Sequence, residues 1–187
     1  MIIKNKIESV KFIKELKLNQ FPEKLVTDKE KKNQEVLDFI QKHPVEFYTL
    51  RDKSKSGGPA FHIVNREDVL NKIKVYKGPF SILESSYNYK DNQLMVGEVL
   101  IKDESVNLIA SFNGELSIRE MYAHPDICLN TTIFDDRSLK KARYFDEIYK
   151  FINEKNLQGV IVEFGYFNKK VGKNKENFII YEIRTSY

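Results

Sequence analysis

Two glutamates near the end of the sequence lie in runs where charged residues are uncommon. Glu163 follows Val-Ile-Val and precedes a phenylalanine, and Glu182 lies inside Ile-Ile-Tyr-Glu-Ile-Arg. Apolar runs of this length are typical of buried strands. If the chain reverses near Gly172 and Lys173, strand geometry brings Glu163 opposite or nearly opposite Glu182. Like charges directly across a strand pair are destabilising, so a sequence that keeps both acids needs a compensating charge.

Two sources of that charge are consistent with the sequence. Mg²⁺ binds one or two carboxylates together with substrate phosphates, and this would make Glu163 and Glu182 metal ligands. Simple alternation predicts that Phe178, Ile180, Glu182 and Arg184 share one face of the last strand. Arg184 would then neutralise one of the acids in a structural ion pair. Both interpretations stay open at this point.

A second candidate site is the polar segment from Arg51 to Gly58, which follows a predicted strand and precedes a predicted helix. Two glycines allow backbone N–H groups to turn toward an anion, and the lysines add positive charge. The order of a Walker A loop is absent, and a solvated surface loop is the alternative. The candidate anion-binding residues are Arg51, Lys53, Lys55, Ser56, Gly57 and Gly58.

The remaining reactive residues form no recognised motif. His43, His62 and His124 are scattered, without the spacing of metal ligands. Cys128 is the single cysteine, which excludes an internal disulfide, and because it lacks a nearby partner we predict a buried thiol. The ten Tyr and thirteen Phe could stack on bases, but most occupy positions that are typical of a core.

The elements that must position these residues follow from hydrophobic periodicity and turn signals. The first 45 residues are predicted to be helical, with a connector at 17–26 and a second helix at 28–42. Residues 114–132 are ambiguous, with one helix ending near Pro125. Two more helices are predicted at 65–77 and 135–155, the second capped by Asp135 or Asp136, and strands at 45–50, 80–85, 94–102, 106–112, 159–164 and 178–184. Since most strands follow one another through hairpins, we expect an α+β fold whose largely antiparallel sheet has helices packed on it.

Composition narrows the class of protein. The chain has 187 residues, of which 41% are hydrophobic and 31% charged, which is the composition of a typical globular protein. This length is sufficient for one well-packed core. No apolar run approaches the roughly 18 residues that span a membrane, and no signal peptide is visible, so we expect a cytoplasmic protein without a membrane partner. The net charge of +4 suits a small polyanion such as a nucleotide but is mild for a dedicated nucleic-acid binder.

Taken in order, these parts resemble the ATP-grasp superfamily. In that family a basic strand residue and a glycine-rich loop cover the phosphates of ATP, a hinge after the next strand contacts adenine, and two late acids hold Mg²⁺. The resemblance matches Arg51 and the loop 54–58 to the phosphate-binding part, and it places Glu84 near the ribose or adenine. It matches Glu163 and Glu182 to the Mg²⁺ ligands.

The sequence departs from the family pattern in two ways. The usual Glu-x-Asn ending is Glu182-Ile-Arg184 here, so a cation replaces one expected metal ligand. We also expect no separate N-terminal domain of the kind that usually supplies the acceptor substrate in that family. The resemblance still covers residues 8–184 and implies one ATP-grasp-like domain over 1–187. Its parts would be a helical lead-in (1–45), the glycine loop with a helix and hinge strands (46–112), and the long helix with the metal-site hairpin (113–187).

The function implied by this resemblance is a Mg-ATP-dependent ligase that joins a carboxylate to an amine or a thiol through an acylphosphate. Its cofactors would be ATP and Mg²⁺, its partner a small-molecule acceptor, and Arg184 would steady the developing charge as the catalytic residue. Two alternatives remain at this point. One is a nucleotide-binding relative without turnover. The other is a nucleic-acid-associated protein that uses the basic loop and the hairpin tip at 169–175.

Overall fold

The computed structural model describes residues 3, 6–52, 61–112 and 122–185. It divides the chain into two compact units. Unit 1 combines Met1–Gln20 with Asp91–Tyr187, and unit 2 is the intervening segment Phe21–Lys90. In the part of the chain that is described, no helix is long and apolar enough to cross a membrane.

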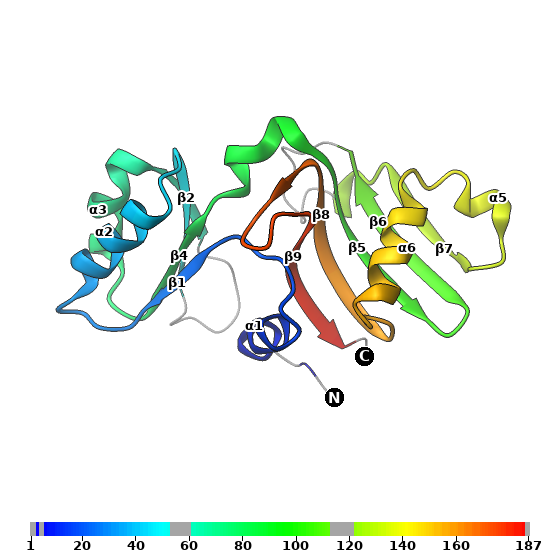
Figure 1. The fold of residues 1–187 in the computed structure, drawn as a ribbon, viewed down its shortest axis with the longest axis horizontal. Helices are drawn as coiled ribbons and strands as arrows, with labels where there is room; N and C mark the ends of the chain where they lie inside the picture. The colour runs from blue at the N-terminus through cyan, green and yellow to red at the C-terminus, as the bar shows by residue number, and fades with distance from the viewer. Residues whose placement is uncertain (1–2, 4–5, 53–60, 113–121, 186–187) are drawn as a thin grey trace. The chain divides into compact units, whose positions relative to one another are not determined.

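Unit 1 is built on a five-stranded antiparallel sheet in the order β7-β6-β5-β8-β9 (Figure 1). The prediction of a largely antiparallel sheet is therefore confirmed. Its strands are β5 (Gln93–Lys102), β6 (Ser105–Ser111), β7 (Ile127–Thr132), β8 (Val160–Val171) and β9 (Glu176–Thr185). Its helices are α1 (Lys6–Glu15), α5 (Asp136–Leu139) and α6 (Phe145–Glu154).

One face of this sheet packs against α6, whose buried residues recur at the spacing of one helix face. The helix contributes Phe145, Ile148, Phe151 and Ile152 to the core. The opposing strand residues include Val99, Leu108, Val162, Phe164, Ile180 and Ile183. This apolar layer fixes which strand positions face inward, and the positions between them face away from α6.

The single helix predicted over 135–155 is wrong, because the chain breaks between α5 and α6. Asp135 does cap α5, where its carboxylate accepts a hydrogen bond from the Ser138 backbone N–H at 3.2 Å. The break ends at Tyr144, whose φ of 63° is left-handed and incompatible with a continuous helix. The Tyr144 ring lies 5.1 Å from that of Tyr166, centroid to centroid, so the break brings an aromatic side chain onto the sheet.

Helix α1 closes the edge of the sheet at β9, which would otherwise expose unpaired backbone groups. The Ile183 backbone N–H donates a 2.8 Å hydrogen bond to the buried Ser9 hydroxyl, and Ile13 of α1 is fully buried in the same core. The first and last described residues also meet, since the Ile3 N–H donates to Thr185 Oγ1 at 3.2 Å. The first helix of unit 1 thus depends on its last strand.

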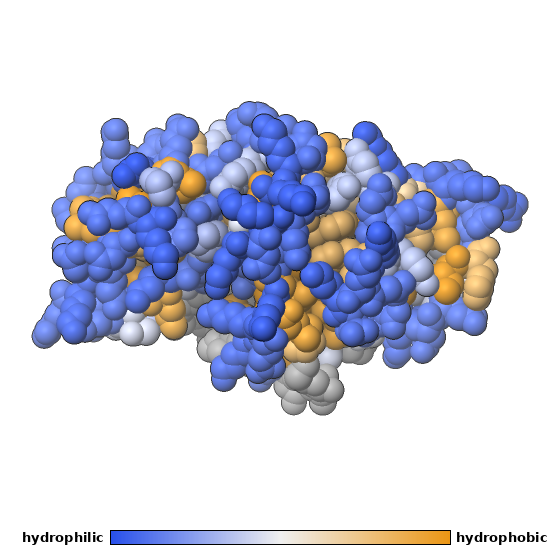
Figure 2. Space-filling model, viewed as in Figure 1, coloured by the Kyte–Doolittle hydropathy of each residue, from blue (hydrophilic) through white to orange (hydrophobic). Residues whose placement is uncertain are grey.

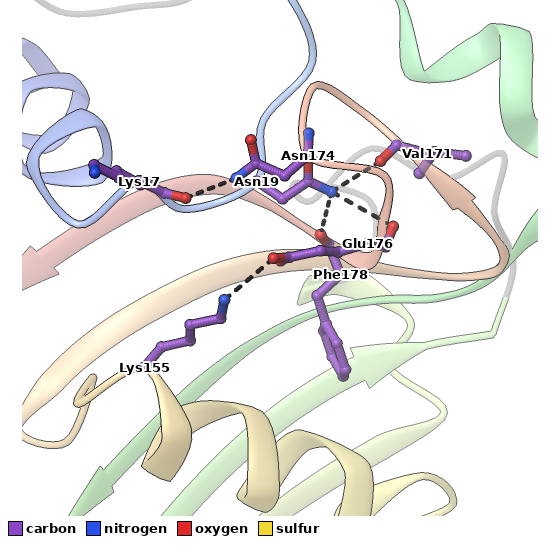
Figure 3. A network of polar contacts seen from close by, with 7 residues as sticks. All are labelled: Lys17, Asn19, Lys155, Val171, Asn174, Glu176 and Phe178. Carbon is purple, nitrogen blue, oxygen red and sulfur yellow. Dashed lines mark hydrogen bonds and ion pairs between the residues drawn. The ribbon is translucent and has the colours of Figure 1, made fainter.

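The segment that follows α1 is tied to the β8–β9 hairpin by the buried side chain of Asn19 (Figure 3). Its amide nitrogen donates to the carbonyls of Val171 and Phe178, both at 2.9 Å, and of Glu176 at 3.4 Å. Its amide oxygen accepts from the Asn174 backbone N–H at 2.8 Å. We call these contacts the Asn19 clamp. They fix the tip of the hairpin that carries both predicted acids.

Unit 2 holds a four-stranded antiparallel sheet in the order β1-β4-β2-β3, with α2 and α3 packed on it (Figure 1). The elements are β1 (Glu23–Val26), α2 (Lys32–Lys42), β2 (Phe47–Asp52), β3 (Phe61–Asn65), α3 (Val69–Lys72) and β4 (Phe80–Glu84). Its core consists mainly of Val36, Phe39, Ile40, Tyr48, Leu50, Val69, Ile73, Phe80 and Ile82.

Several short elements differ from the sequence expectation. The connector at 17–26 contains β1, the segment before the predicted helix at 65–77 contains β3, and the ambiguous stretch contains β7, so three edge strands were not predicted. The helix predicted at 65–77 is only the single turn α3 flanked by 3-10 turns at Arg66–Asp68 and Ile73–Val75. Strands of four to six residues carry too few alternating positions for periodicity to detect them.

Hydrophilic side chains cover most of the face seen in Figure 2, and hydrophobic ones appear in interrupted patches between them. This distribution agrees with the large buried apolar cores of both units.

Candidate functional site

Three glutamates stand side by side on adjacent strands of unit 1. Glu163 on β8 pairs with Glu182 on β9 and, on its other side, with Glu98 on β5. We call these three residues the carboxylate row. The prediction that Glu163 comes opposite Glu182 is confirmed. Glu98 was missed, although it is the only acidic residue within the otherwise mostly apolar strand β5.

A β-bulge on β9 places Glu182 on the face away from α6, beside Glu163. Glu163 pairs with Glu182, but the next residue, Phe164, pairs with Ile180, so Tyr181 is an extra residue on β9. Ile180 points into the core, whereas Glu182 points to the opposite face together with Glu163. The predicted common face for Phe178, Ile180, Glu182 and Arg184 is therefore wrong, because the bulge exchanges the two faces of β9 at Tyr181.

Arg184 bridges two members of the carboxylate row. Its guanidinium donates one hydrogen bond to Glu163 Oε1 and another to Glu98 Oε2. The side chains of Arg184, Glu98 and Glu163 are only 31%, 14% and 16% exposed, so these are half-buried ion pairs rather than surface ones. Tyr122 adds side-chain hydrogen bonds to Glu98 and Arg184. The ion pair between Arg184 and one of the two predicted acids, which was one interpretation of the sequence, is thus present. Arg184 also forms an ion pair with a further acid, Glu98.

The surroundings of Glu163 disfavour its charged form. Burial raises the pKa of Glu163, the neighbouring charge of Glu182 raises it further, and the bonds from Arg184 only partly oppose this. Burial by itself would lower the pKa of Arg184, but its hydrogen bond to Glu163 and the charges of Glu98 and Glu163 outweigh burial and raise it. Arg184 therefore remains a fixed cation at every physiological pH.

The donor set fits a divalent cation that arrives with its own ligands. Strand pairing brings three carboxylates together at the row, and Arg184 bonds to one oxygen each of Glu98 and Glu163. Across the described ranges, no group of three or more His, Cys, Asp or Glu side chains is arranged to hold a metal ion by itself. Mg²⁺ typically uses one or two carboxylates and completes its shell with water and substrate phosphates. The row has the oxygen donors for that kind of site.

Glu84 ends β4 in unit 2 and is nearly buried, at 8% exposure. Its Oε2 accepts a 3.0 Å hydrogen bond from the Tyr89 hydroxyl, and its Oε1 lies 3.5 Å from His43 Nδ1. Burial and the charge of Glu84 raise the pKa of Tyr89 to about 12, so Tyr89 remains a hydrogen-bond donor. These contacts hold the Glu84 carboxylate in one orientation.

Arg51 lies on β2 between β3 and β4, and its backbone position faces Ser81 of β4. Within the described part of the chain, the buried Ser81 hydroxyl has no hydrogen-bond partner. An unsatisfied buried hydroxyl is uncommon, and a polar ligand is one explanation for it. The other predicted loop residues, Lys53, Lys55, Ser56, Gly57 and Gly58, lie outside the described residues.

The remaining candidates carry no site among the described residues. His43 belongs to the contacts of Glu84, and no cluster of metal-ligating side chains includes His62 or His124. The prediction that Cys128 is buried is wrong, because it lies on the edge strand β7 with its side chain exposed.

Comparison with known proteins finds similarity at the level of structure. No protein-family model matches the sequence, and no curated protein sequence matches it. Similar solved structures include N5-carboxyaminoimidazole ribonucleotide synthetase in complex with ADP (TM-score 0.54, 12% identity, 98% of this chain and 45% of that one). Another is the macrocyclase MdnC of Microcystis aeruginosa MRC bound with precursor peptide MdnA (TM-score 0.53, 13% identity, 96% and 51%). A third is the D-alanine-D-alanine ligase of Coxiella burnetii (TM-score 0.50, 11% identity, 96% and 47%).

The match extends over nearly all of this chain but only about half of each similar protein. At these identities the similarity concerns the arrangement of the backbone. The expectation drawn from the order of the sequence elements is confirmed at that level: the chain has the α+β fold of the ATP-grasp ligases.

Proposed function

We propose that this chain is the nucleotide-binding part of an ATP-dependent ligase that activates a carboxylate as an acylphosphate. The observation that carries the proposal is the carboxylate row, in which Glu163 and Glu182 oppose each other on the ATP-grasp fold. Proteins rarely keep like charges directly across a strand pair without a reason, and perturbed carboxylates cluster at functional sites. A phosphate-bound divalent cation supplies such a reason.

Each predicted residue has a role in this proposal. Glu163 and Glu182 would hold Mg²⁺, which neutralises the phosphates when it is bound. Glu84, fixed by Tyr89 and His43, would accept hydrogen bonds from the ribose or adenine. The phosphates would be bound by Arg51, Lys53, Lys55, Ser56, Gly57 and Gly58. Arg184 would stabilise negative charge as it develops.

The proposed reaction has two steps. A carboxylate oxygen of the acceptor attacks the γ-phosphorus of ATP and ADP leaves, which forms an acylphosphate. An amine or thiol then attacks the acyl carbon, phosphate leaves, and the nucleophile loses its proton. The protein's contribution would be mainly to position the reactants and to neutralise charge.

Calorimetry with Mg-ATP and Mg-ADP tests the nucleotide-binding part directly. We expect binding that requires the divalent cation and that is lost in Glu163→Gln, whereas Glu104→Gln in the exposed β5–β6 turn leaves it unchanged. Circular dichroism of each variant checks that the fold is retained. Absence of any heat of binding at millimolar nucleotide would overturn the proposal. Formation of ADP only when candidate carboxylate and amine acceptors are present would support the ligase step.

A further inference from the structure

Unit 1 has a further surface feature, a pocket of about 350 Å³ between α6 and the β8–β9 hairpin. Glu147 and Phe151 of α6 line it, together with Tyr166, Glu176 and Phe178 of the hairpin. We call it the α6 pocket. Phe178 belongs to the core layer that α6 covers, whereas the carboxylate row lies on the other face of the sheet. The α6 pocket is therefore separate from the proposed nucleotide site.

Aromatic rings form the apolar wall of the α6 pocket. The ring of Phe178 lies 4.4 Å from that of Phe151 and 4.6 Å from that of Tyr166, centroid to centroid. Phe151 and Phe178 are buried, and Tyr166 keeps part of its surface exposed. The face of an aromatic ring carries partial negative charge and attracts a cation placed over it. An apolar chain that ends in a cation therefore matches this wall.

The charged side chains that line the α6 pocket favour a cation over an anion. Lys150 Nζ lies 3.8 Å from Glu154 Oε1, so this lysine already has an acidic partner. Lys155 Nζ lies 3.2 Å from Glu176 Oε1, and Figure 3 shows this contact at the end of α6. Glu147 forms no ion pair with any residue that the structure describes. The pocket thus has three glutamates against two lysines, and the third glutamate has no counter-ion within the described residues.

Two carboxylates of the pocket can accept hydrogen bonds from a bound group. The charge of Glu147 acts at the aromatic wall, because burial and then this carboxylate raise the pKa of Tyr166. Glu176 Oε2 is buried and has no hydrogen-bond partner among the described residues, which is uncommon for a buried oxygen. The last torsion of a glutamate side chain is broad, so this oxygen can turn toward a donor in the pocket. A cation with several N–H donors would satisfy both acids.

We propose that the α6 pocket binds a primary alkylammonium group. Such a group carries one positive charge and three N–H donors, which suit the carboxylates of Glu147 and Glu176. Its alkyl chain lies against the rings of Phe151, Tyr166 and Phe178. The volume of the pocket is at the lower end of the range for ligand sites, which fits a group of this size. A lysine side chain and a small free amine both present this chemistry.

Backbone amide chemical shifts of the isotope-labelled full chain, recorded during titration with n-butylammonium chloride, test this proposal. Butanol, which has a similar shape and no charge, is the matched ligand control, and sodium chloride keeps the ionic strength constant. We expect saturable shifts at Phe151, Asn177 and Phe178 with butylammonium. Butanol should bind about tenfold more weakly, because it has neither the attraction to the rings nor that to the acids.

Protein variants separate the contribution of the charge from that of the rings. Glu147→Gln should weaken butylammonium binding about fivefold, since it removes a balancing charge and keeps the shape of the side chain. Tyr166→Leu should weaken binding about threefold, since leucine is apolar but has no ring face. Asp136→Asn on the exposed helix α5 is the control and should leave the affinity unchanged.

The same titration with Nα-acetyl-lysine N-methylamide identifies the source of the ammonium group. Tighter binding than that of butylammonium would support a lysine side chain, and weaker binding would support a free amine. Absence of saturable shifts, or equal binding of butanol and butylammonium, would overturn the proposal. Equal affinity in Glu147→Gln and the unchanged protein would also overturn it. Glu147 is exposed, so this variant still decides if Tyr166→Leu fails to fold.

Discussion

Glu163 on β8 lies directly opposite Glu182 on β9, and a single arginine two residues beyond Glu182 bonds to Glu163 but also to Glu98. The arginine that bonds to one of the two opposed acids is therefore shared with a third acid. The charge of Glu182 raises the pKa of Glu163, so the two acids repel each other across the strand pair. The consequences of this repulsion can be measured in the protein without any ligand.

Replacing Glu182 with glutamine should stabilise the protein and weaken its proposed ligand binding. Removing the like charge opposite Glu163 is expected to raise the free energy of unfolding by about 0.5 to 1 kcal/mol at neutral pH. The same change should reduce the affinity for Mg-ATP, because one proposed ligand to Mg²⁺ becomes neutral. Urea denaturation and calorimetry measure the two effects. Glu104→Gln is the matched control, and a destabilised Glu182→Gln protein would contradict the prediction.

The stability difference between the unchanged protein and Glu182→Gln should depend on pH. Because burial and Glu182 raise the pKa of Glu163 above its usual 4.5, the folded state keeps the Glu163 proton to a higher pH than the unfolded state does. This group therefore favours folding in acid, and its contribution is lost as the pH rises through the raised pKa. We expect the advantage of Glu182→Gln to grow over that interval.

Carbon-detected NMR titration of the Glu163 carboxyl would follow the same effect directly. Its pKa should fall in Glu182→Gln and rise in Arg184→Gln, where a stabilising bond is lost. A midpoint that is the same in all three proteins would show that the row is not electrostatically coupled.

The Asn19 clamp should carry a large share of the stability of unit 1. Asn19→Ala removes the donors to three carbonyls and the acceptor for Asn174, inside a fully buried site. We expect a loss of about 3 kcal/mol, since buried backbone groups are left unpaired. Asn33→Ala on the exposed face of α2 is the control and should change stability by less than about 0.5 kcal/mol. Equal urea midpoints for both variants would contradict this prediction.

Gly172 follows β8 at the hairpin turn and Gly159 precedes β8, and together they allow a matched test of steric crowding around an added side chain. Gly172 and Gly159 have positive φ values of 73° and 77°, so the unfavourable backbone energy of an alanine is similar at each position. A Cβ at Gly172 would meet Ile179 Cδ1 at 2.4 Å and Asn19 Oδ1 at 2.7 Å, whereas one at Gly159 meets nothing within 4 Å. Thermal unfolding should show Gly159→Ala losing about 1 kcal/mol and Gly172→Ala about 3 kcal/mol or more.

The sequence predicts the antiparallel hairpins and the Glu163–Glu182 pairing because both follow from local alternation and a nearby turn. It does not predict that Glu98 joins them, because the pairing of β5 with β8 connects segments more than sixty residues apart. The sequence also does not predict the backbone conformation at Tyr181 or at Tyr144. The bulge at one and the left-handed backbone at the other are set by long-range packing, which periodicity does not report.

Unit 2 interrupts unit 1 in the chain, and α1 seals the edge of β9, the final strand. During synthesis, residues 21–90 leave the ribosome before β9 exists. The apolar side of α1 therefore cannot pack against β9 until nearly the whole polypeptide has been synthesised. We expect nascent chains stalled ahead of β9 to contain a folded unit 2 and an unprotected first helix that chaperones can recognise.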